Sequence, residues 1–193
     1  MTQRFSASES VLAALHPEES AVVLALLASA CSELAEEAAE LAVALLDEVD
    51  CQEVADQVES LVRSVDQFDL YEGAGRTASG WYVHPAEAAW RNLDELAGPL
   101  VGDIERRAAA GLEEAALEFC KGVVLGLYRV EHGPPCDARD HVPDWPTETA
   151  CEAVRIWRVT RRPSRGSVSS RRSLPRAFVQ ECVPKWGEML GRP

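Results

Sequence analysis

Apolar residues recur at steps of three and four along much of the chain, the spacing that places them on one face of an α-helix. No Gly or Pro occurs between Pro17 and Glu48, so this segment is predicted to form one long helix or two closely joined helices. Its stripe consists of Leu24, Leu27, Cys31, Leu34, Ala38, Leu41 and Leu45. We expect the stripe to be buried in a helical core.

The same periodicity predicts further helices near 51–65, 86–107, 112–130 and 147–159. Asp50 is expected to cap the first of them, and Gly98-Pro99 is expected to kink or divide the second. The Gly-rich segment 66–84 and the Pro-rich segment 131–146 are expected to be loops. These elements predict an all-α fold of antiparallel helical hairpins, arranged as a bundle or a short α-solenoid.

Residues 21–30 are apolar almost all round the predicted helix, so they should be buried either centrally in the bundle or against a second copy. A homo-oligomer is therefore left open. The first ten residues lack the apolar core of a signal peptide, and the longest apolar run is far shorter than the ~20 residues of a membrane span. We expect a cytoplasmic protein that does not enter membranes.

The charge is divided unevenly along the chain. The net charge is −13, but residues 151–193 contain ten Lys or Arg and three acids, whereas residues 1–150 contain nine bases and 29 acids. This predicts an acidic helical domain over 1–160, a flexible Arg/Ser-rich linker over 161–173 and an amphipathic segment over 174–193. The acidic domain should repel nucleic acid, so such binding would depend on residues 161–176 alone.

Two short resemblances accompany these patterns. Residues 111–119 (GLEEAALEF) resemble the second helix of a tetratricopeptide unit. Residues 85–90 (PAEAAW), 112–118 (LEEAALE) and 120–128 (CKGVVLGLY) are similar to the helical region that accompanies prokaryotic SWIM-type zinc-finger proteins. The zinc finger itself is missing from this chain. The resemblance therefore implies only a helical accessory or interaction domain.

His132, Cys136 and His141 form the candidate metal site, because imidazole and thiolate suit zinc. Their spacing matches no established zinc pattern, and only three N/S ligands are local. The alternative interpretation is an exposed polar loop in which Asp137 and Asp140 serve as turn or cap residues. No cofactor is expected apart from zinc at this site.

Arg76, Trp81 and Tyr82 in the Gly-rich loop are candidate ligand or partner contacts, because Arg pairs with anions and aromatic rings stack. The alternative, which we favour, is that Trp81 and Tyr82 cover one end of the helical core. The loop matches neither a P-loop nor a dinucleotide-binding fingerprint.

The basic linker supplies a last candidate contact surface, formed by Arg161, Arg162, Arg171 and Arg172. It could bind a protein or nucleic acid, or dock on the acidic domain of its own chain. No histidine lies in a recognised nucleophile motif, so no catalytic residue is predicted. We expect a non-enzymatic helical protein-interaction module, an adaptor or regulator. The alternatives are a metal-binding protein or enzyme using residues 131–144, and a nucleic-acid-associated protein acting through the basic segment.

Overall fold

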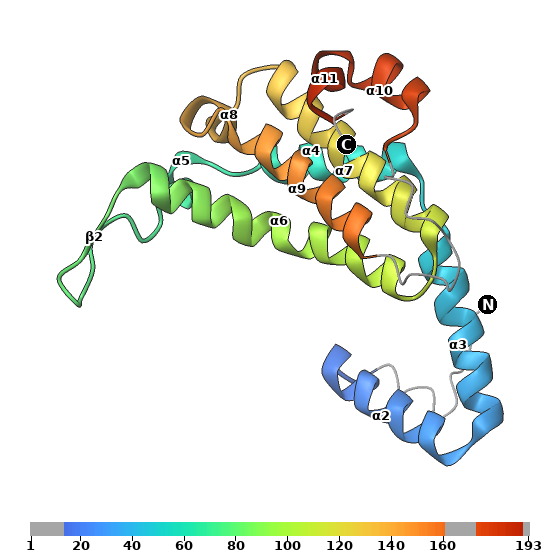
Figure 1. Ribbon diagram of the computed structural model, residues 1–193. Helices are drawn as coiled ribbons and strands as arrows, with labels where there is room; N and C mark the ends of the chain where they lie inside the picture. The colour runs from blue at the N-terminus through green and yellow to red at the C-terminus, as the bar shows by residue number, and fades with distance from the viewer. Residues whose placement is uncertain (1–13, 161–172, 191–193) are drawn as a thin grey trace, which may run out of the picture. The chain divides into compact units, whose positions relative to one another are not determined.

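The computed structural model describes residues 14–160 and 173–190. It confirms the all-α fold, because these residues form helices connected by short turns and one small two-stranded sheet (Figure 1). The chain divides into two units, residues 1–45 and 46–193, which are described separately below.

The first unit contains helix α2 (Pro17–Ala30) and most of helix α3 (Ser32–Asp47). A capping box begins α2, in which the His16 backbone N–H donates to the Glu19 carboxylate at 2.9 Å. The extended backbone of Cys31 separates the two helices. The prediction of two closely joined helices is thus confirmed for this segment.

The predicted burial of the α2–α3 stripe is wrong for this unit, since no residue of either helix is buried. Cys31, expected in the core, is only half-buried. The reason is physical: periodicity determines which face of a helix is apolar, but it does not supply a neighbouring element to cover that face. The two helices meet at Cys31 and do not pack along each other.

The second unit is built on four helices that pack on one another: α4 (Cys51–Arg63), α6 (Pro85–Ala109), α7 (Glu113–His132) and α9 (Trp145–Val159). Helix α7 is central and contacts the other three (Figure 1). Its apolar stripe is buried, including Phe119, Val123, Leu127 and Val130, and Cys120 is buried beside it. A single apolar core therefore joins these helices.

Glycines let α4 and α7 approach closely. A Cβ atom at Gly122 would lie 2.5 Å from Val54 Cβ, and one at Gly126 would lie 2.6 Å from Val58 Cβ. Asp50 caps α4 as predicted, accepting from the backbone N–H groups of Gln52 (2.6 Å) and Glu53 (3.3 Å).

Two expectations about chain breaks need correction. Helix α6 runs through Pro99 as one helix of 25 residues, so Gly98-Pro99 does not divide it. The two predicted loops also contain regular structure. Segment 66–84 holds helix α5 (Gln67–Leu70) and an antiparallel pair of strands, β1 (Gly75–Arg76) and β2 (Tyr82–Val83), while segment 131–146 holds helix α8 (Asp137–His141).

The C-terminal amphipathic segment packs on the core of its unit through α10 (Arg176–Cys182), η1 (Pro184–Trp186) and α11 (Gly187–Leu190). Pro184 begins η1 and interrupts the α-helical regularity of this segment. The Trp186 ring lies edge-on to Tyr128, with centroids 5.2 Å apart, and Arg158 Nη2 donates to the Leu190 carbonyl oxygen at 2.9 Å. No helix within residues 14–160 or 173–190 is long and apolar enough to cross a membrane.

Candidate interaction site

Large apolar side chains are exposed along α2 and α3, which we call the N-terminal helix pair (residues 17–47). Eight of them have exposed fractions between 43% and 78%. They are Val22, Leu24, Leu26, Leu27, Leu34, Leu41, Val43 and Leu45. Contiguous exposed apolar surface of this kind marks interaction sites in folded proteins.

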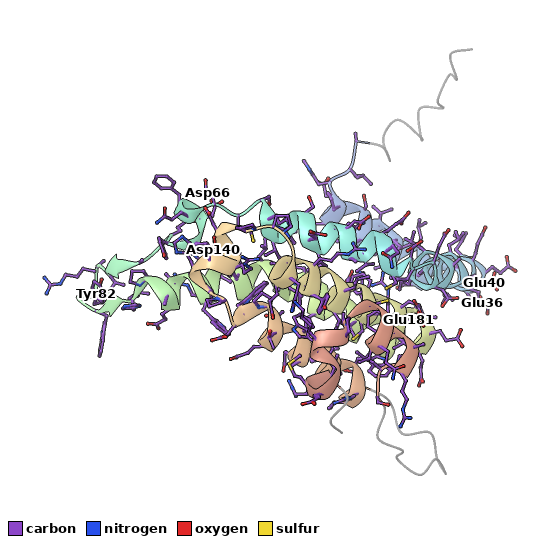
Figure 2. The ribbon with its side chains drawn as sticks, turned by 90° about the horizontal axis from the view of Figure 1, so that it is seen from above. Glu36, Glu40, Asp66, Tyr82, Asp140 and Glu181 are labelled. Atoms are coloured by element: carbon purple, nitrogen blue, oxygen red, sulfur yellow. The ribbon has the colours of Figure 1, made fainter. Side chains whose placement is uncertain are left out.

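The two helices of the pair differ in the distribution of their apolar residues. Helix α2 carries no charged residue after Glu19 and is apolar on every side. Helix α3 is amphipathic: Leu34, Leu41 and Leu45 share one face, while its glutamates occupy the other. Glu36 and Glu40 are seen on the same side of α3 in Figure 2. The pair therefore offers a helix without charges after its first turn, next to a helix with one uncharged face.

A second exposed feature is the β1–β2 hairpin, which extends beyond the helices of its unit (Figure 1). Arg76 pairs directly with Tyr82 across the two strands, so their side chains share one face, and Trp81 immediately precedes β2. Trp81 is 77% exposed and Tyr82 67% exposed, and Tyr82 is labelled at the projecting end in Figure 2. The favoured interpretation, that these rings cover the core, is therefore wrong, because the hairpin carries them away from it.

Hydrogen bonds hold the base and the tip of this hairpin. Asn92 Nδ2, on α6, donates to the carbonyl oxygens of Asp69, Leu70 and Glu72 at 2.9, 3.1 and 3.1 Å. The Thr77 backbone N–H donates to the Trp81 carbonyl oxygen at 2.8 Å. Gly80 has a φ of 88°, which few other residues tolerate. The exposed rings are thus presented on a defined backbone.

The candidate zinc ligands have separate neighbours. The His132 ring stacks on Tyr128 with centroids 4.2 Å apart, and its Nε2 lies 3.7 Å from Glu131 Oε1. His141 Nδ1 is 2.8 Å from the Tyr71 hydroxyl oxygen. Cys136 precedes the first turn of α8. Within the part of the chain that the structure describes, no group of three or more His, Cys, Asp or Glu side chains could hold a metal ion, and the zinc site stays a prediction.

Three of the thiols are kept protonated by burial. Burial raises the pKa of the Cys120 thiol to about 12 and also raises the pKa values of Cys51 and Cys151. A raised pKa keeps the group protonated at neutral pH, whereas nucleophilic cysteines need a lowered one. In contrast, the Arg155 hydrogen bond lowers the pKa of the exposed Glu152 carboxyl.

A surface groove between α6 and α9 was not recognised from the sequence. It has a volume of about 380 Å³ and is lined by Trp90, Asp94, Glu148 and Glu152, among others. Asp94 Oδ1 accepts from Trp145 Nε1 at 2.9 Å. The available signal was the i, i+4 spacing of Trp90 with Asp94 and of Glu148 with Glu152, which puts each pair on one helix face.

Arg161, Arg162, Arg171 and Arg172 lie outside the described residues. No known protein-family model matches the chain, and comparison with curated proteins and with solved structures gives no match either. The resemblances to a tetratricopeptide unit and to the SWIM-associated helical region therefore stay predictions.

Proposed function

We propose that this chain is a non-enzymatic helical protein-interaction module, acting as an adaptor or regulator. The observation that carries the proposal is the N-terminal helix pair, in which no residue is buried although eight large apolar side chains lie along it. Helices of 14 and 16 residues are marginal in water on their own and are normally stabilised by packing. A partner that covers them would supply that packing.

The free energy gained by burying these eight side chains is comparable to the cost of association. Each of the eight side chains is about half exposed, so covering the rest gains roughly 1 kcal/mol apiece, or about 8 kcal/mol in all. Association costs an estimated ~4–15 kcal/mol in lost translational and rotational freedom and ordering. Since the partner's own apolar side chains add a comparable gain, the sum favours binding.

The hairpin supports the same function. Trp, Tyr and Arg are the residues that most often dominate binding energy at interfaces, and all three occur together at Arg76, Trp81 and Tyr82. Because hydrogen bonds already order this hairpin, binding through it would lose little conformational entropy. The proposal includes a cytoplasmic location, which the six free cysteines support because thiols persist in reducing compartments.

The test is capture of binding proteins from a low-salt extract by the full chain and by two variants. One variant replaces Leu26, Leu34, Leu41 and Val43 by Glu. The control, Val159→Glu, alters a residue of α9 that is 69% exposed. We expect wild type and control to retain a shared set of proteins, further copies of the chain included, that the fourfold variant loses. Recovery of the same set by all three would contradict the proposal.

A further inference from the structure

In sequence, the exposed stripe of the N-terminal helix pair follows one heptad register, which the extended backbone of Cys31 divides between the two helices. Its members alternate steps of three and four, so they occupy the a and d positions of a coiled-coil repeat. The a positions are Leu24, Cys31, Ala38 and Leu45, and the d positions are Leu27, Leu34 and Leu41. Every d position is thus Leu, which is typical of two-stranded coiled coils. The Leu side chains of this seam are all exposed, from 43% at Leu34 to 78% at Leu45.

The charges of α3 lie away from this seam. Glu33 and Glu40 occupy c positions and Glu36 an f position, which point outward in a coiled coil. The e positions, Ala28, Ala35 and Ala42, are uncharged, and among the g positions only Glu37 carries a charge. Charged e and g residues normally set the choice of partner and its orientation. Their near absence leaves a seam that two identical copies can share without opposing charges of the same sign at each step.

We infer that the seam of the N-terminal helix pair binds the same seam of a second copy, so that the protein is a homodimer joined by paired helices. The inference rests on the proposed function and names its partner. A two-fold interface must be self-complementary, which an uncharged Leu and Ala surface satisfies.

Sedimentation equilibrium of the full chain tests the inference. We expect wild type to have about 42 kDa, twice the 21.1 kDa of one chain. Leu34→Glu with Leu41→Glu puts charges at two d positions and should raise the dissociation constant by roughly 100-fold or more. The matched control, Ala25→Glu with Ala39→Glu, introduces the same charges at two exposed b positions outside the apolar surface and should change it by about threefold at most. Added salt should strengthen the dimer, because each copy carries a net charge of −13.

Tryptophan fluorescence gives an independent reading of folding, because all five Trp residues lie in the second unit. At a protein concentration low enough to keep both variants monomeric, the seam variant and the control should have the same midpoint of thermal unfolding. A monomeric wild type, equal weakening by seam and control variants, or a lower midpoint in the seam variant alone would overturn the inference. A monomeric wild type whose protein capture still depends on the helix pair would refute the homodimer and leave the proposed function standing.

Discussion

Gly126 tests the close approach of α4 and α7. A Cβ atom there would lie 2.6 Å from Val58 Cβ and 2.7 Å from the Ala55 carbonyl oxygen, well inside the ~3.5–4.0 Å at which carbon atoms pack favourably. Because the Ala55 oxygen belongs to the backbone, the helices must separate to admit the methyl group. Such overpacking costs about 1–3 kcal/mol, whereas replacing Gly by Ala within a helix returns about 1 kcal/mol. Gly126→Ala should therefore destabilise the protein by about 1 kcal/mol net, or about 2–4 °C in Tm.

Gly102→Ala on α6 is the matched control, because nothing lies within 4 Å of its added Cβ. It should stabilise the protein by about 1 kcal/mol through helix propensity alone. The difference between the two variants, about 2 kcal/mol, then isolates the steric cost from the propensity. Urea unfolding followed by Trp fluorescence measures both, with unchanged m values. Agreement of the two variants within about 0.5 kcal/mol would refute the reasoning.

Three further outcomes are expected. Asp50→Ala removes the cap of α4 and should lower the free energy of unfolding by about 1 kcal/mol, measured by urea denaturation, while Asp50→Asn should retain most of it. Trp186→Ala removes a side chain that is 4% exposed and should cost about 3–5 kcal/mol, with faster proteolytic cleavage after Lys185 than in wild type. Because the pKa of Cys120 is raised in the folded state, its stabilising contribution is complete below about pH 9 and declines as pH rises toward 12. Stability measured from pH 8 to 11 should therefore fall less steeply in Cys120→Ala than in wild type; equal slopes would contradict this.

Helix periodicity predicted the second unit well where the apolar pattern was long. The stripe of α7 and the Asp50 cap of α4 were both identified, since each depends on local sequence and meets an adjacent helix. Shorter elements were missed for a physical reason. The strands β1 and β2 have two residues each and α8 has five, which is too short to establish a period.

At Pro99, packing outweighs the tendency of proline to end a helix. Proline removes one backbone hydrogen bond and clashes with the preceding turn, which favours a break. Helix α6 nonetheless continues, with Leu93 and Ala97 buried before Pro99 and Ile104 and Arg107 buried after it. Packing along both halves thus stabilises a continuous helix despite the local cost. The interpretation of the projecting hairpin was also wrong: its aromatic composition suggested cover for the core, whereas Trp81 and Tyr82 are 77% and 67% exposed.

The apolar stripes of α3 and α7 have similar sequence patterns, but only the stripe of α7 is buried. Both helices place Leu and Ala on one face, yet α7 is covered by three helices of its own unit and no residue of α3 is buried. An amphipathic pattern indicates that one face of a helix has to be buried. A heptad register indicates that a second helix running alongside can bury it. On α7 the glycines Gly122 and Gly126 break any heptad seam and admit a crossing helix at close range. On α3 no glycine occurs and the heptad register runs from Leu34 to Leu45 without a break, which suits a helix lying alongside rather than a crossing one.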